Sequence, residues 1–173
     1  ERATYVLPEG GKVLYVDPGM AFGTGLHETT RLCLGAIIEF FEETGSEELS
    51  CIDIGCGSGI LALSAKLLGA GNAKGFDVDP DAIRISIENA TANGMTGDVS
   101  FTTNDIAGGL FSESADLVLA NIQADVLCAN AELLLCAVRP QGCLALSGIL
   151  SIEAKKTAAF FQETINCLGL SFI

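Results

Sequence analysis

Positive charge is scarce in this chain. Only 9 of its 173 residues are Lys or Arg, against 22 Asp and Glu, so the formal net charge is −13. A nucleic-acid footprint needs clustered Lys and Arg, so we expect no direct nucleic-acid partner. An acidic surface suits either a basic protein partner or simple solubility, and solubility is the plainer explanation.

Long apolar runs and targeting signals are missing as well. No uninterrupted apolar stretch is long enough to cross a bilayer, although nearly half of the residues are hydrophobic. The chain does not open with the basic and apolar regions of a signal peptide. We therefore expect no membrane partner and a cytoplasmic location.

Metal-binding side chains are few. There is one histidine, His27, and no C-x-x-C pair, so we expect no metal site. Cys56 lies inside a glycine turn with no histidine near it in sequence, which favours a small turn residue over a nucleophile. The seven cysteines favour buried, reduced thiols, because most stand in or beside apolar runs: Cys33, Cys51, Cys128, Cys136 and Cys143.

Apolar patterning predicts strands that alternate with helices. Strands are expected near 13–16, 50–54, 73–78, 98–102, 116–120 and 143–149, and 170–173 is expected to start another. Helices are expected over 29–41, 58–68, 80–94, 124–138 and 151–167, with Pro140 ending the fourth. In the third helix, Ile83, Ile87 and Ala90 are expected to form the inward stripe. No repeat or linker divides the chain, so the pattern predicts one α/β domain over 1–173, a mostly parallel sheet with helices on both faces in a three-layer sandwich.

The most informative stretch runs from residue 51 to residue 79. The turn Asp53-Ile54-Gly55-Cys56-Gly57-Ser58-Gly59 follows a short apolar strand and precedes a helical pattern and a second strand that ends on Asp77. Glycines let the backbone approach a ligand closely, and a carboxylate at a strand end can accept hydrogen bonds from a ribose diol. The alternative is a tight turn that holds no ligand.

The glycine spacing separates two kinds of nucleotide site. The dinucleotide fingerprint G-x-G-x-x-G would need glycine at position 60, where Ile60 stands. A dehydrogenase that binds NAD is therefore only the third choice.

Two polar residues follow later strands. Asp105 could accept a hydrogen bond from an adenine amino group, or it could be a solvated turn residue. Asn121 could accept hydrogen bonds from an amine and orient its lone pair toward a methyl group, or it could satisfy its own backbone. The carboxyl ends of parallel strands meet at one edge, so we expect both residues near the glycine turn and favour a functional Asn121.

A glycine-containing loop runs from Phe22 to Thr30. Gly23 and Gly25 make it pliable, and it leads into a helix N-terminus, where backbone N–H groups favour an anion such as a carboxylate. His27 could touch the ligand, hold the loop or act on the substrate. Because it stands in a polar loop, we favour a functional role over a structural one.

Five segments together resemble the PrmA-type family, the methyltransferases of the large-subunit ribosomal protein L11. They are 17–30 (DPGMAFGTGLHETT), 53–62 (DIGCGSGILA), 75–80 (GFDVDP), 120–122 (ANI) and 146–150 (LSGIL), and the match covers nearly the whole chain. The resemblance implies a Rossmann-like class I methyltransferase fold and S-adenosylmethionine as cofactor. It also implies methylation of protein amines, on lysine side chains and on an α-amine, with a ribosomal protein as partner.

The resemblance also assigns residues. It implies that Thr30, Gly55, Asp77 and Asn121 contact the cofactor, and that Phe22 and His27 belong to a loop that closes over it. We predict Asn121 and His27 as catalytic. The predicted cofactor-binding residues are Phe22, Thr30, Asp53, Gly55, Gly57, Gly59, Asp77, Asp105 and Asn121.

The family's N-terminal recognition domain finds no room before residue 17, so we expect the catalytic domain alone. Two other functions stay open: a small-molecule methyltransferase on the same fold, and a cofactor-binding domain without turnover.

Overall fold

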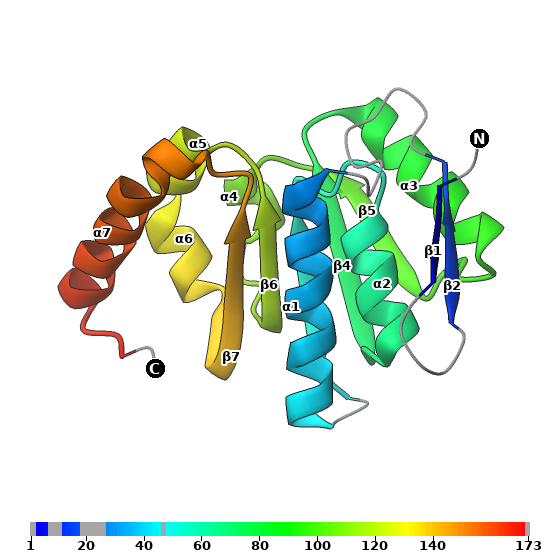
Figure 1. Cartoon of the computed structure of the whole chain (residues 1–173), viewed down its shortest axis with the longest axis horizontal. Helices are drawn as coiled ribbons and strands as arrows, with labels where there is room; N and C mark the ends of the chain where they lie inside the picture. Colours follow the sequence, from blue (N-terminus) through cyan, green and yellow to red (C-terminus); the bar gives the residue numbers. More distant parts are fainter. Residues whose placement is uncertain (1–2, 7–11, 18–26, 46–47, 172–173) are drawn as a thin grey trace.

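A five-stranded parallel sheet forms the centre of the computed structural model, which describes residues 3–6, 12–17, 27–45 and 48–171 (Figure 1). The strand order is β5-β4-β3-β6-β7, and every neighbouring pair is parallel. This confirms the predicted α/β class. The strands are β3 (Ser50–Ile54), β4 (Asn72–Asp77), β5 (Val99–Thr103), β6 (Ala115–Asn121) and β7 (Val138–Ser147).

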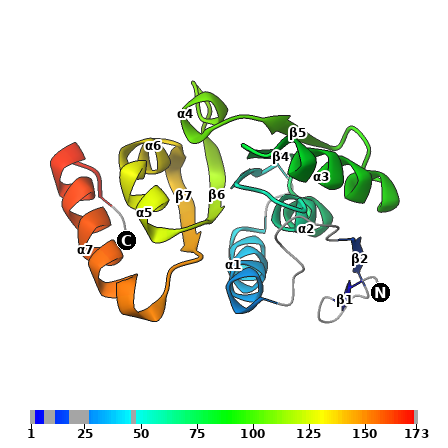
Figure 2. The same ribbon diagram turned by 90° about the horizontal axis from the view of Figure 1, so that it is seen from above.

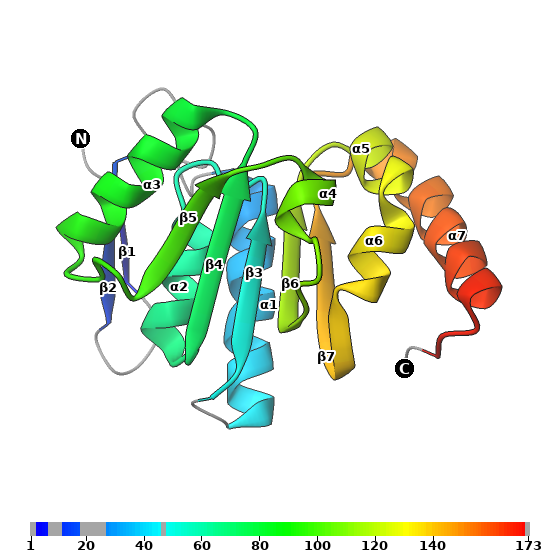
Figure 3. The same ribbon diagram turned by 180° about the vertical axis from the view of Figure 1, so that it is seen from behind.

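Helices cover both faces of this sheet, which confirms the three layers. The helices α1 (Glu28–Thr44) and α2 (Ile60–Leu68) lie on one face, and α3 (Pro80–Ala92) packs beside them against β4 and β5. The opposite face carries the short α4 (Ile106–Gly109), α5 (Ala124–Ala129) and α6 (Ala131–Cys136), with α7 (Ser151–Leu168) packed outside α5 and α6. Figure 2 shows the layers from above, and Figure 3 shows the second face.

The sequence of the central strands explains this burial. In β6, Leu117 and Leu119 belong to the cluster under α1 and α2, while Val118 and Ala120 belong to the cluster under α5 and α6. Side chains of a strand alternate between faces, so a strand covered on both faces reads as a continuous apolar run. The strands over 50–54 and 116–120 come close to this pattern, with Cys51, Ile52 and Ile54 in the first and 117–120 all apolar in the second, which is why they were predictable.

A two-stranded antiparallel sheet stands beside α3. It consists of β1 (Ala3–Val6) and β2 (Val13–Val16), and β2 confirms the expected short strand. The Asn93 side chain accepts from Tyr15 N (2.8 Å) and donates to Tyr15 O (2.6 Å), while Asn89 accepts from Asp17 N (2.9 Å) and donates to Asp17 O (3.0 Å). Two side-chain amides, Asn89 of α3 and its C-cap Asn93, thus satisfy backbone groups of β2 and of the residue that follows it.

Two expectations for the region after β6 are wrong. The single helix over 124–138 is two short helices, because Asn130 interrupts the helical backbone with φ −118° and ψ 15°. Pro140 does not end a helix but lies inside β7, where the register shifts between the pairs Ala115–Val138 and Leu117–Cys143. β7 is an edge strand, and a bulge on an edge tolerates a residue without an N–H group.

Two expectations about burial and one about a strand are also wrong. Ile87 is 48% exposed, so the inward stripe of α3 is wrong at that position, and Ser86 and Asn89 are buried instead. All seven cysteines are free, but Cys136 and Cys167 are exposed rather than buried. Leu170 and Ser171 form no strand, and 172–173 lie outside the described residues.

Within the described part of the chain, no helix is both long and apolar enough to span a membrane.

Candidate functional site

A cavity of about 490 Å³ opens at the carboxyl ends of the strands. Its wall comes from the segments after β3, β4, β5, β6 and β7 and from the start of α1. β3 pairs with β4 on one side and β6 on the other, so the chain changes direction across the sheet at this point. Ligands of open α/β sheets bind at such a point, past the strand ends.

The glycine turn forms the wall after β3. Gly55, Gly57 and Gly59 have φ of 67°, 53° and 78°, a left-handed backbone that L side chains rarely adopt. The N–H groups of Gly55 and Cys56 donate to Phe76 O at 2.9 and 3.0 Å, which ties the turn to the end of β4. The three alternate glycines are thus required by the path of the backbone, and Gly55 and Gly57 line the cavity.

Asp77 forms the wall after β4. Its Oδ2 accepts from Gly57 N and its Oδ1 accepts from Asp79 N, both at 3.0 Å. Two backbone donors hold the carboxylate in one orientation, and each oxygen keeps capacity for a further hydrogen bond. Asp79 itself caps α3, as its position before Pro80 predicts.

Asn121 forms the wall after β6. Its Nδ2 donates to the buried Thr30 Oγ1 at 3.4 Å, which links the end of β6 to the first turn of α1. Its Oδ1 is buried and finds no donor among the described residues. A buried carbonyl oxygen without a donor is costly, so this atom is an acceptor that a bound N–H group would satisfy.

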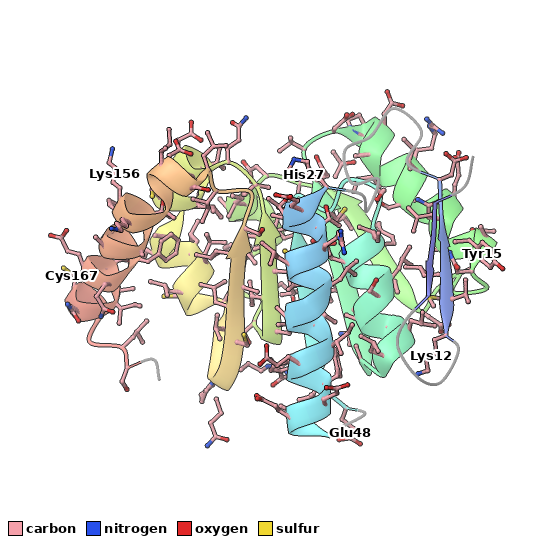
Figure 4. The ribbon with its side chains drawn as sticks, in the orientation of Figure 1. Lys12, Tyr15, His27, Glu48, Lys156 and Cys167 are labelled. Atoms are coloured by element: carbon pink, nitrogen blue, oxygen red, sulfur yellow. The ribbon has the colours of Figure 1, made fainter. Side chains whose placement is uncertain are left out.

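His27 lines the cavity at the start of α1 (Figure 4). It is the N-cap of that helix, and its Nδ1 lies 3.4 Å from Thr29 N and 2.7 Å from Thr29 Oγ1. The structure therefore gives His27 a capping contact and a place in the wall, while its catalytic role stays a prediction. Phe22 lies outside the described residues.

Asp53 lies behind the glycine turn. It is 1% exposed, and its Oδ2 accepts from Ala62 N in α2 at 3.1 Å, while its Oδ1 has no donor among the described residues. Burial raises the pKa of this carboxyl to about 7. Asp53 is not part of the cavity wall, so a direct cofactor contact stays a prediction.

Asp105 is the N-cap of α4 in the structure. Its Oδ1 accepts from Gly108 N at 2.7 Å and caps α4, whereas its neighbour Asn104 lines the cavity. The adenine contact of Asp105 stays a prediction. Asn104 and Asp105 are adjacent after the end of β5, and only Asn104 lines the cavity.

Sequence reasoning missed other wall residues. They are mostly apolar and each follows a strand end or begins the next helix, which is the signal that could have found them: Val78, Ile106, Ile122, Val126, Ile149 and Leu150. Gly148 and Gln123 also line the cavity.

The described residues of this site offer no activated thiol and no cluster of metal ligands. Burial, with a smaller contribution from the Asp53 carboxyl, raises the pKa of the Cys56 thiol far above its ordinary value. Across the described residues, no group of three or more His, Cys, Asp or Glu side chains could hold a metal ion. The wall therefore offers hydrogen-bonding groups and apolar surface, which suits binding and orientation.

Comparison with known proteins identifies the family. The family model described as ribosomal protein L11 methyltransferase (PrmA) matches residues 4–167. The chain belongs to the ribosomal protein L11 methyltransferase family. This confirms the resemblance carried by the five sequence segments.

Individual relatives agree. The chain is 44% identical over 152 residues to the ribosomal protein L11 methyltransferase of Dechloromonas aromatica, covering 88% of this chain and 48% of that protein. The protein of that name from Azotobacter vinelandii is 46% identical over 156 residues, covering 90% of this chain and 51% of the relative. The chain thus spans about half the length of the curated relatives it matches.

Solved structures agree on the fold. The ribosomal protein L11 methylase of Lactobacillus delbrueckii subsp. bulgaricus superposes with a TM-score of 0.74 at 30% identity, covering 86% of this chain and 73% of that one. A SAM-dependent methyltransferase of Agrobacterium tumefaciens gives a TM-score of 0.73 at 17% identity, covering 95% of this chain and 58% of that one. The Rossmann-like methyltransferase fold expected from the sequence is confirmed.

Proposed function

We propose that this chain is the catalytic domain of an S-adenosylmethionine-dependent methyltransferase that methylates amines of ribosomal protein L11, on lysine side chains or at the N-terminus. The Oδ1 of Asn121 carries the proposal, because Asn121 lines the cavity and this buried acceptor has no donor among the described residues. Family membership and the relatives named as L11 methyltransferases support the substrate.

The residues of the cavity fit this cofactor. The Asp77 carboxylate, held by Gly57 N and Asp79 N, would accept from the ribose hydroxyls. Thr29 and Thr30 stand in the first turn of α1, whose N–H groups and dipole favour the methionine carboxylate. Bound there, S-adenosylmethionine would supply an electrophilic methyl group, and the neutral thioether would leave as the amine nitrogen bonds to the methyl carbon.

The acceptor amine must be neutral to react. A free lysine has a pKa of about 10.4, so its neutral form costs about 4.6 kcal/mol at pH 7. The wall near Asn121 is apolar, with Ile122, Val126 and Leu150, and burial there beside a cation lowers the pKa of the amine.

Asn121 would then orient the amine. Its Oδ1 accepts one N–H of the neutral amine, which leaves the nitrogen lone pair directed at the methyl group. Thr30 Oγ1 accepts from Nδ2 at the other end of the Asn121 amide and so helps to hold this side chain in place. His27 or a water molecule takes the proton that the amine loses.

A transfer assay tests the proposal. The protein is incubated with methyl-labelled S-adenosylmethionine and ribosomal protein L11, and label on L11 is located by mass spectrometry. We expect label on lysine or N-terminal amines. Cofactor binding without label on L11 would contradict the substrate and leave the small-molecule methyltransferase or the binding domain without turnover. No cofactor binding would contradict the methyltransferase itself, and titration with NAD would follow.

A further inference from the structure

The segment Leu146–Leu150 is one of the five that carry the family resemblance, yet the mechanism above uses only Leu150 from it, as part of the apolar wall. It joins the end of β7 to α7, and Gly148, Ile149 and Leu150 line the cavity. Asn121 and Ser147 are the last paired residues of β6 and β7, so Ile122 and Gly148 are the first residues past the ladder on neighbouring strands.

Gly148 lies directly on the backbone of Ile122. A Cβ atom added to Gly148 would stand 2.5 Å from Ile122 O and 2.9 Å from both Ile122 C and Ile122 N. Real Cβ atoms essentially never come within 3.0 Å of another heavy atom, so the Ile122 carbonyl would have to separate from Gly148 by about half an ångström or more, and Ile122 N, in the peptide that follows Asn121, is also too close. The close approach therefore requires glycine, independently of the φ of 80°.

A second glycine holds the other side of the same residue. A Cβ atom added to Gly55 would stand 2.5 Å from Ile122 Cγ2. Gly55 opens the glycine turn, which Gly55 N and Cys56 N tie to the end of β4. Ile122 is thus confined between two glycines: Gly55 of the glycine turn lies against its side chain, and Gly148 lies against its backbone.

Ser147 ties the same segment to α1. Its Oγ donates to Thr29 O at 3.2 Å, and the next residue of α1, Thr30, accepts from Asn121 Nδ2. The amide of Asn121 is therefore set from two directions. Hydrogen bonds through α1 hold its side chain, and the contact of Gly148 with Ile122 holds its backbone.

We propose that Gly148 is a positioning residue of the methyl-transfer reaction, which fixes the distance between the Asn121 amide and the glycine turn by confining Ile122 against Gly55. The inference rests on the proposed function and deepens it. Misplacement of a reacting group by about 1 Å can cost about a hundredfold in rate, so a shift of half that size is enough to lower turnover severely.

Gly148→Ala tests this, with Gly97→Ala as the matched control. Gly97 has a φ of 84° and nothing within 4 Å of an added Cβ, so the control carries the same backbone strain without the contact. We expect kcat of Gly148→Ala to fall at least about tenfold below that of Gly97→Ala, with the S-adenosylmethionine Kd of the two within about threefold. A kcat equal to the control, or equal losses in kcat and affinity, would overturn the proposal.

A measurement that needs no turnover separates this inference from the proposed function. The side-chain amide signals of Asn121 are followed by NMR in the same two variants. We expect them to shift in Gly148→Ala and to stay in place in Gly97→Ala, and unmoved signals in Gly148→Ala would refute the positioning role. Failure of the wild-type protein to methylate any amine would instead refute the proposed function.

A second variant covers the case in which Gly148→Ala fails to fold. Ile122→Ala removes the Cγ2 that lies against Gly55 and introduces no clash. We expect kcat to fall at least about tenfold while cofactor affinity is retained. Wild-type kcat in Ile122→Ala would contradict the inference.

Discussion

The two walls of the cavity are built differently. The wall after β3 and β4, made by the glycine turn and Asp77, is tied by backbone N–H groups: those of Gly55 and Cys56 bind Phe76 O, and that of Gly57 binds Asp77. The wall after β6 and β7 rests on two longer side-chain hydrogen bonds, from Asn121 to Thr30 and from Ser147 to Thr29, and on glycine contacts. It also keeps one buried acceptor, Asn121 Oδ1, without a donor among the described residues.

From this difference we infer different functions for the two walls. Groups that are already oriented and hydrogen-bonded bind a ligand without reorganisation, which suits the cofactor. An acceptor whose donor arrives only with the substrate contributes to turnover rather than to cofactor binding. We therefore expect substitutions in the first wall to change affinity or stability and those in the second to change kcat.

The largest expected effect lies beneath the first wall. The pKa of Asp53 is about 7 in the folded protein and about 3.9 in an unfolded chain, so the folded state holds the proton more tightly. The contribution of Asp53 to stability is therefore complete below about pH 4 and is lost as the pH rises to about 7. The side chain of Asp53→Asn cannot ionise. The free energy of unfolding of this variant, relative to that of wild type, should therefore rise by a few kcal/mol, on the order of what the pKa shift implies, between about pH 4 and 7 and stay constant above pH 7.

Denaturant unfolding across that pH range measures the difference. Asp98→Asn is the matched control, because Asp98 is exposed and lies far along the chain from the turn. A stability difference between Asp53→Asn and wild type that does not change with pH would show that Asp53 ionises normally.

The second effect concerns turnover. Asn121→Ala removes the acceptor that orients the amine, and we expect kcat to fall about a hundredfold or more, as for the loss of other preorganised hydrogen-bonding groups. Cofactor affinity and melting temperature should change little, as in the exposed control Asn166→Ala. Steady-state kinetics with L11 would check this, and an unchanged kcat would remove Asn121 from the mechanism.

The smallest effect concerns affinity. Asp77→Ala removes the acceptor for the ribose hydroxyls, and calorimetry should show binding of S-adenosylmethionine weakened about tenfold or more, or about 1.4 kcal/mol. Asp98→Ala changes the same charge at an exposed turn and should bind like wild type. Equal affinity of the Asp77 and Asp98 variants would place the ribose elsewhere.

The sequence predicted the sheet and the first wall well, because both depend on local patterns. Buried parallel strands read as apolar runs, and the left-handed turn at Gly55, Gly57 and Gly59 demands glycine. Asn121 and Asp77 were predicted at this edge of the sheet because each stands at the end of a strand and matches a family segment.

The features that could not be predicted from the sequence depend on contacts between distant segments. Ser86 and Asn89 are buried in α3 because they donate to Gly57 O (2.8 Å) and Ser58 O (2.9 Å), while the more apolar Ile87 stays 48% exposed. Hydrophobic periodicity contains no information about such polar contacts, so it predicted Ile87 for the inward stripe of the helix. The space that Gly148 leaves for Ile122 likewise exists only after β6 and β7 have paired.

The central claim is the division of work between the walls, and one paired measurement tests it most directly. Cofactor Kd and kcat at saturating cofactor are determined for Asp77→Ala and Asn121→Ala side by side. The account predicts a crossed result, in which Asp77→Ala loses affinity and keeps most of its kcat, while Asn121→Ala keeps its affinity and loses kcat. Two variants that lose the same quantity to the same extent would contradict it.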